Sequence, residues 1–294
     1  LLTPAVAAVQ GRLDGRWVLG GSAAAPTLSG ELALGEVAAE VPAAGLKLHD
    51  GRVRVTARAD GGLDVDGSLA SGDGRVQLRG SAGLKASTPL DLRLEGADFL
   101  AADIPAARVV VSPALHLVRT AERTTLQGEV AVPSAQVDLS RLPGGGAAKA
   151  SPDVVVTDAA QTASAAPPPV YTDVTLKLGD AVKLKGFGLD GALSGQLAVS
   201  DRPGRQTTGR GEIRVSGTYK AYGQDLAIET GRLQFAGTAI DNPGLDLRAV
   251  RKLEEVTAGL RVQGTARVPV LTVYAEPPME QAEALSYLVT GKPL

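Results

Sequence analysis

The sequence predicts an all-β protein, and three observations lead to that prediction. Apolar and polar residues alternate with a period of two through most of residues 51–277. The chain contains 36 glycines, which interrupt the alternation at short intervals. The turns between neighbouring runs, such as residues 59–62 and 71–74, are too short to hold a crossover helix. Together these features predict antiparallel strands joined by hairpins, each with one dry face and one wet face.

The first half of the chain contains the clearest alternation. Around Val53 and Val55, polar residues occupy every second position between apolar ones. The same scheme recurs downstream, and each run has the length of a typical strand. We therefore expect strands at residues 52–58, 63–69, 75–79, 90–95 and 126–132.

The alternation stops between residues 143 and 169. This segment is rich in alanine, glycine and proline and surrounds one short apolar run, residues 154–156. Such a composition is typical of a linker or a loop excursion. We therefore divide the chain into a β-rich segment at residues 1–142, a linker at 143–169 and a second β-rich segment at 170–294. The two β-rich segments form either separate sheets or one continuous β-structure.

The strand pattern resumes in the second β-rich segment. Strands are expected there at residues 174–178, 182–185, 195–199, 212–216, 224–235, 245–249 and 256–268. Strands of typical length would number roughly twenty in the whole chain. In a single sheet, with about 4.8 Å between strands, they would span about 90 Å.

One helix is expected, at residues 279–289. Pro277 and Pro278 precede it and Gly291 follows it, as is usual at the two ends of a helix. Within it, one stripe carries four apolar residues, namely Ala282, Leu285, Leu288 and Val289. The helix is therefore short and lies at the C-terminal end.

The composition argues against several classes of function. The formal net charge is −2, only 3% of residues are aromatic, and no basic segment contains interleaved aromatics, so we expect no nucleic-acid binding. The chain has no cysteine, and its two histidines, His49 and His116, are far apart in sequence, so we expect no metal site. We find no set of residues suited to catalysis, and therefore expect no catalytic residue, no enzyme activity and no cofactor.

The alternation by itself does not determine what covers the dry face of the strands. Half-buried antiparallel strands usually pack on each other, so a β-sandwich or a β-helix with an ordinary dry core is the arrangement that the pattern favours. An open sheet would instead leave a dry trough, which is stable in water only when something apolar occupies it.

The last third of the chain carries motifs that distinguish these arrangements. Residues 217–226 (GTYKAYGQDL), 231–237 (GRLQFAG), 241–245 (DNPGL), 276–279 (EPPM) and 285–294 (LSYLVTGKPL) closely resemble the C-terminal domain of the TamB family. The resemblance extends over the whole chain by its strand pattern and rests on specific motifs from residue 151 onward.

The resemblance implies a fold and a function. The fold is a long, curved antiparallel sheet that forms an open, apolar-lined trough, with one short C-terminal helix. Proteins of this family and the AsmA-like proteins similar to them are associated with carrying phospholipid between the inner and outer bacterial membranes, and with outer-membrane protein assembly. The implied partner is an outer-membrane barrel of the TamA or BamA type.

The resemblance also implies a location. The chain would be the periplasmic part of a protein that is anchored in the inner membrane and reaches a membrane at both ends. The apolar segment at residues 1–10 is short and contains Pro4, so we expect neither a signal peptide nor a membrane span in it. The anchor is therefore expected outside this chain.

The resemblance and the alternation together suggest which side chains contact lipid. Acyl chains would lie on alternate apolar residues, and the charged headgroup would project from the open seam. The expected lining consists of Val53, Val55, Leu63, Val65, Val76, Leu78, Leu92, Leu94, Leu126, Val130, Leu176, Leu178, Leu197, Val199, Ile213, Val215, Leu226, Ile228, Leu233, Phe235, Leu245, Leu247, Leu260 and Val262. For the partner contact we expect Leu285, Leu288 and Val289, although the same helix could cap or plug the trough.

A second function from a different class remains. A chaperone or scaffold could pair its exposed sheet edge with the nascent strands of an outer-membrane protein, by β-augmentation and without lipid transport. Crosslinking at the apolar face would separate the two hypotheses.

Overall fold

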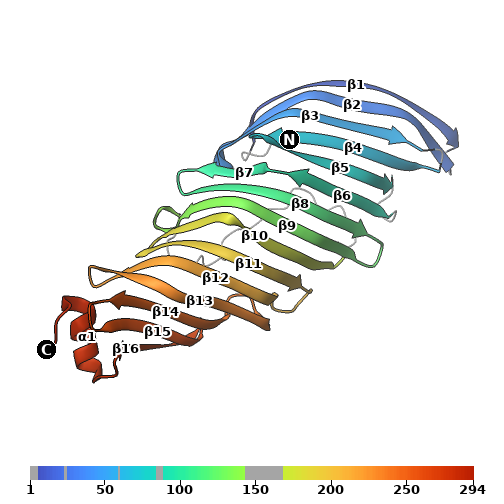
Figure 1. Ribbon diagram of the computed structural model, residues 1–294. Coiled ribbons are helices and arrows are strands. Elements are labelled where there is room, and N and C mark those ends of the chain that lie inside the picture. The colour runs from blue at the N-terminus through green and yellow to red at the C-terminus, as the bar shows by residue number, and fades with distance from the viewer. Residues whose placement is uncertain (1–5, 23–24, 59, 84–88, 143–167) are drawn as a thin grey trace, which may run out of the picture.

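One long, open sheet contains most of the residues that the structure describes. The computed structural model describes residues 6–22, 25–58, 60–83, 89–142 and 168–294. These residues form sixteen strands in a single sheet that does not close on itself, and one short α-helix at the C-terminal end (Figure 1). The all-β prediction, with an open sheet and one terminal helix, is confirmed.

The first nine strands run from Ala7 to Asp138 and follow one another along the sheet, except that β7 pairs only with β8. A short 3₁₀ helix, Pro42–Ala44, separates β2 from β3. The strands are β1 (Ala7–Ser22), β2 (Ala25–Val41), β3 (Leu46–Ala57), β4 (Gly62–Ser71), β5 (Gly74–Gly83), β6 (Leu90–Ala97), β7 (Phe99–Ile104), β8 (Ala107–Arg119) and β9 (Thr124–Asp138).

The remaining seven strands continue the same sheet, and each pairs antiparallel with the next. A second 3₁₀ helix, Leu139–Arg141, follows β9. These strands are β10 (Val170–Gly186), β11 (Leu189–Asp201), β12 (Thr208–Ala221), β13 (Gln224–Ala239), β14 (Gly244–Lys252), β15 (Thr257–Thr265) and β16 (Val268–Glu276).

The expected antiparallel meander is wrong at one junction, because β9 and β10 run parallel. Thr124 lies opposite Val170 at one end of this pair, and Asp138 lies opposite Lys185 at the other. Parallel neighbours need a long return connection, and the chain between Asp138 and Val170 is long enough for one. The two β-rich segments therefore belong to one sheet. The predicted linker, with its apolar run at 154–156, lies almost entirely outside the described residues.

The strands are fewer and longer than the expected twenty. The runs predicted at 174–178 and 182–185 are two parts of β10, which continues through an irregularity between Leu178 and Val182. Strand lengths reach 17 residues, well above the typical five or six. Fifteen neighbouring strands at about 4.8 Å spacing give a sheet roughly 70 Å across, which is narrower than the expected 90 Å.

The helix α1 (Gln281–Thr290) lies within two residues of its predicted bounds. It ends at Gly291, whose left-handed backbone (φ 77°) lets its N–H donate to the carbonyl of Tyr287 at 3.0 Å. The predicted apolar stripe is partly wrong, because Ala284 and Leu288 are the buried residues while Ala282 is exposed. Ala284 and Leu288, four residues apart, lie on the same side of the helix and pack against the sheet. Ala282 lies about half a helical turn from Ala284 and therefore faces away from the sheet.

Two glycines on neighbouring strands make room for large side chains. In β11 and β12, Gly195 lies opposite Ile213, and Gly211 lies opposite Leu197. Both glycines have positive φ, 117° and 139°, which L-residues rarely adopt. A Cβ atom at Gly195 would lie 2.2 Å from the Glu212 carbonyl oxygen. Glycine is therefore required at this position by the close approach of the backbones.

Replacing Gly195 by alanine is expected to lower the free energy of unfolding by about 1–3 kcal/mol, because the backbone there is strained for any other residue. Urea unfolding followed by circular dichroism would measure the change. Gly35→Ala is the matched control, because the space around Gly35 is open and its φ is ordinary. It should change stability by less than about 0.5 kcal/mol. Equal effects of the two substitutions would contradict the explanation.

Candidate functional site

Strand register determines which side chains share a face of the sheet. Residues directly opposite each other on neighbouring strands point to the same side. Val55 lies opposite Val65, Val65 opposite Gly80, and Leu78 opposite Leu94. Followed strand by strand in this way, the register places every residue of the predicted lining on one side. We call this side the apolar face.

The apolar face continues across the second half of the sheet. Leu176 lies opposite Leu197, and Leu247 lies opposite Val262. In β13, an irregularity between Ile228 and Thr230 keeps Leu226 and Leu233 on the same face, although a strict period of two would separate them. The bulge thus preserves an unbroken apolar surface.

Most of this surface is only half-buried. Val53 is 38% exposed, and most other lining residues are partly exposed. Five are buried, namely Leu197, Ile213, Leu226, Phe235 and Leu260. In the described part of the chain no second sheet covers the apolar face. The packed sandwich that alternation alone favours is therefore not the arrangement of these strands, which form one open sheet with a largely uncovered apolar face.

Several residues of the apolar face were not predicted. In β8, register places Val109, Leu115 and Leu117 on it, and in β9 Val132 and Ala135 are buried against Val182 of β10. An extra residue in β9 opposite β8, and another in β10 opposite β9, interrupt the period of two in these strands, so a search for strict alternation passes over Val132, Ala135 and Val182. The short Leu115-His116-Leu117 alternation is the signal that identifies β8.

The opposite side, which we call the polar face, carries charged side chains that pair across strands. Lys177 lies 2.7 Å from Glu129, and Arg79 lies 3.1 Å from Asp66. These pairs are largely exposed, so each contributes little to stability. Among the described residues, no group of three or more His, Cys, Asp and Glu side chains is arranged to hold a metal ion.

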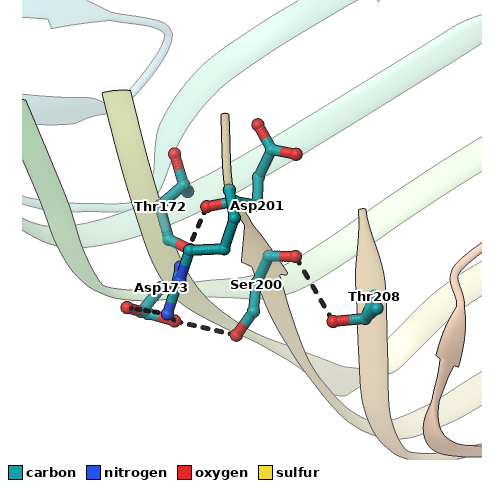
Figure 2. A network of polar contacts seen from close by, with 6 residues as sticks. Thr172, Asp173, Ser200, Asp201 and Thr208 are labelled. Carbon is teal, nitrogen blue, oxygen red and sulfur yellow. Dashed lines mark hydrogen bonds and ion pairs between the residues drawn. The ribbon is translucent and has the colours of Figure 1, made fainter. Parts of the chain in front are cut away.

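A polar network closes one end of strands β10 to β12. The Arg202 guanidinium donates to both carboxylate oxygens of Asp173, at 2.7 and 2.9 Å, and to the carbonyl of Thr172 at 2.8 Å (Figure 2). The Ser200 hydroxyl donates to Asp173 at 2.8 Å. The hydrogen bonds from Arg202, with a smaller contribution from Ser200, hold the pKa of the Asp173 carboxyl below its usual value, against partial desolvation. The network joins the end of β11, and Arg202 that follows it, to the start of β10, so its role is structural.

Replacing Asp173 by asparagine is expected to make the free energy of unfolding depend less on pH in the acidic range. The lowered pKa means that the carboxylate stabilises the fold above about pH 4, and that this contribution is lost as the pH falls through the folded-state value. The loss at pH 7 should be at most about 1 kcal/mol, because the pair is more than a third exposed. Urea unfolding at pH 7 and pH 3 would measure it. Asp73→Asn, at an exposed turn, should leave the profile unchanged.

The helix α1 covers the apolar face at the C-terminal end of the sheet (Figure 1). Leu288 is fully buried against Leu226, Ala258 and Leu260. From β14, the Arg251 guanidinium donates to the carbonyl oxygen of Leu288 at 3.0 Å. It also lies 3.4 Å from the carbonyl oxygens of the residues on either side. A cation at this position satisfies the C-terminal carbonyls and the helix dipole.

The three residues predicted for a partner contact therefore differ in their surroundings. Leu288 has no exposed surface and packs on the sheet, so it has nothing to offer a partner in this arrangement. Leu285 is 38% exposed, and Val289 is half-buried. Partner contact by Leu285 and Val289 stays a prediction.

Comparison with known proteins identifies the family. A family model described as the TamB C-terminal domain matches residues 64–294, which is most of the chain. The chain belongs to the TamB C-terminal domain family. A curated relative, the translocation and assembly module subunit TamB of Haemophilus influenzae, is 27% identical over 307 residues. The alignment covers 97% of this chain and 23% of the relative, so the chain spans about a quarter of that TamB protein.

The sheet extends beyond the matched region on its N-terminal side. The matched region begins at Asp64, within β4. Strands β1 to β3 precede it, yet they pair in sequence with β4 and extend the same apolar face. The open sheet therefore continues beyond the TamB C-terminal domain as the family model defines it.

Proposed function

We propose that this chain is the periplasmic part of a TamB-type protein that carries the acyl chains of phospholipid along its apolar face, between the inner and outer membranes. The observation that supports the proposal is the unbroken, half-buried apolar face of the open sheet. An exposed apolar surface of this length is unfavourable in water unless an apolar ligand covers it. Acyl chains have the chemistry and the shape to cover it.

The lining provides affinity without chemical specificity. Each CH₂ group that moves from water to an apolar surface gains about 0.8 kcal/mol, so two acyl chains can be held firmly by valine and leucine alone. Strands along the sheet present similar side chains, as at Leu92 and Leu94 of β6 and Leu176 and Leu178 of β10. Neighbouring positions should therefore bind with similar free energy, which allows movement along the trough.

The wider role is proposed from the family and from the relative's name. TamB of Haemophilus influenzae is called a translocation and assembly module subunit, and we assign this chain a matching role in outer-membrane protein assembly with a barrel of the TamA type. Leu285 and Val289 of α1 are the residues that we expect to contact the barrel. Within the ranges that the structure describes, no helix is long and apolar enough to cross a membrane. Anchoring in the inner membrane is proposed for a segment outside this chain.

A photo-crosslinking residue at Leu233 tests the proposal directly. Leu233 lies on the apolar face of β13, and its neighbour Gln234 points to the polar face and is exposed. We expect phospholipid adducts, detected by mass spectrometry, at position 233 and not at 234. Absence of lipid at both positions, in protein taken directly from the bacterial envelope, would exclude the conduit.

One feature supports the second candidate function, the scaffold. The strand β16 pairs with β15 on one side and is a sheet edge on the other within the described residues. Val268, Val270 and Leu271 are all more than half exposed, and register places Val270 and Leu271 on opposite faces. An edge strand that is apolar on both faces suits pairing with a strand from another protein.

A crosslinker at Val270 separates the scaffold from the conduit. Capture of an outer-membrane barrel strand at position 270, without lipid at position 233, favours the scaffold. Lipid at position 233 supports the conduit whatever position 270 captures. Pro269 has no N–H to offer a partner strand and limits pairing at this end of the edge.

A further inference from the structure

Charged residues on the apolar face lie at the ends of strands, and most have a partner. Arg251, at the end of β14, donates to the last carbonyls of α1. Asp201, at the end of β11, accepts a hydrogen bond from the Thr207 hydroxyl at 2.7 Å. Both charges are therefore used within the fold, one to hold the helix and one to order the turn before β12.

Arg119 is the exception. It is the last residue of β8, and it lies opposite Leu90 of β6 and Thr124 of β9. Register places it on the apolar face, two positions beyond Leu117. Among the described residues, its buried Nε has no hydrogen-bond partner and its guanidinium forms no ion pair.

A buried guanidinium N–H without a partner is uncommon in folded proteins and unfavourable. The nearest candidate carboxylate along the neighbouring strand, Asp91, lies on the polar face and accepts from His116 at 2.8 Å. Arg119 is therefore a cation at the end of a strand on the apolar face, and the described residues provide no counter-charge for it.

We infer that Arg119 binds the phosphate group of a phospholipid whose acyl chains lie on the apolar face. This inference rests on the proposed function and specifies the ligand within it. The planar guanidinium presents parallel N–H donors that match two oxygens of a phosphodiester. Immediately inside the rim, Leu92, Leu117 and Leu126 form a row of directly opposed leucines, which would hold the first part of the acyl chains.

The arrangement selects for a lipid over a free anion. Inorganic phosphate could use the donors of Arg119 but not the leucine row, whereas diacylglycerol could use the row but not the donors. A phospholipid uses both, with its headgroup near water and its chains inside. Along a trough with otherwise similar positions, this site would be a preferred resting place for a lipid.

The test compares two lipids with identical acyl chains, phosphatidylglycerol and diacylglycerol, bound to the full 294-residue chain and detected by native mass spectrometry. The wild-type chain is expected to prefer phosphatidylglycerol by about tenfold or more, which corresponds to about 1.4 kcal/mol. Arg119→Met retains the apolar stem and should bind both lipids nearly equally. Arg93→Met is the matched control, because Arg93 is exposed on the polar face of the neighbouring strand β6 and should keep the preference.

Each result bears on one proposal. If Arg119→Met binds both lipids and keeps the wild-type preference, the phosphate is recognised elsewhere and the inference is wrong, while the conduit stands. If the wild-type chain binds neither lipid, the proposed function itself fails. If Arg119→Met does not fold, Arg119→Lys replaces it and should reduce the preference, because lysine lacks the paired donors. If inorganic phosphate, added at the same concentration as phosphatidylglycerol, displaces that lipid, the site binds anions without requiring lipid. That result would also overturn the inference.

Discussion

Replacing Val76 and Leu78 together by aspartate is expected to slow phospholipid transfer between vesicles by about a hundredfold. These two residues are the large apolar side chains that β5 presents on the apolar face, and both are half-buried. A carboxylate placed beside an acyl chain costs a few kcal/mol, and about 2.7 kcal/mol on a barrier corresponds to a hundredfold in rate. In the proposed conduit a lipid passes every strand, so one unfavourable strand would limit the whole path.

The control for this prediction adds the same charge to the other face. Gln77 of β5 and Gln127 of β9 are exposed on the polar face, so Gln77→Asp with Gln127→Asp should leave transfer within about twofold of wild type. Transfer of a fluorescent phospholipid between donor and acceptor vesicles measures both variants, and circular dichroism verifies that each retains its strands. Unchanged transfer with a folded Val76→Asp, Leu78→Asp variant would mean that lipid does not travel along this face.

Replacing Leu288 by alanine is expected to give the largest loss of local stability in the chain. Leu288 is fully buried, and the residues around it include Leu226 and Ala258, which are themselves completely inaccessible. Removal of a leucine side chain from such a site typically costs about 2–5 kcal/mol. The loss should appear as faster amide hydrogen exchange throughout α1, since Leu288 provides much of the packing of the helix on the sheet.

Leu285→Ala is the matched comparison, because it makes the same change on the same helix at a position that is 38% exposed. Its effect on exchange in α1 should stay below about 1 kcal/mol. Similar effects at positions 285 and 288 would indicate that α1 is not held on the apolar face as described. A fall in binding of the barrel partner with Leu285→Ala alone would support the predicted role of that residue.

The faces of the strands could be predicted from the sequence because a period of two depends only on local backbone geometry. Val53 and Val55, or Leu92 and Leu94, point to one side in any extended strand. The family motifs then distinguished an open trough from a packed sandwich, which alternation by itself favours. Burial of the lining side chains depends on what lies over the sheet, and that is a property of the whole chain.

Other features depend on relations between distant residues and have no local signal. The parallel pairing of β9 with β10 requires Thr124 to meet Val170, and no pattern near either residue indicates this. The partner of Leu288 is Leu226, which lies far away in sequence. Arg119 was not predicted either, because its significance comes from the lack of a counter-charge among the described residues around it in the folded sheet.

The parallel junction also has a consequence for the order of folding. On either side of this junction, strands that pair are close in sequence. Strands β1 to β9, and strands β10 to β16, can therefore each pair one after another with little loss of chain entropy. Among the strands that the structure describes, only β9 and β10 pair across a long stretch of chain. Refolding should therefore show two fast steps that build the halves, followed by one slower docking step that makes the lining continuous.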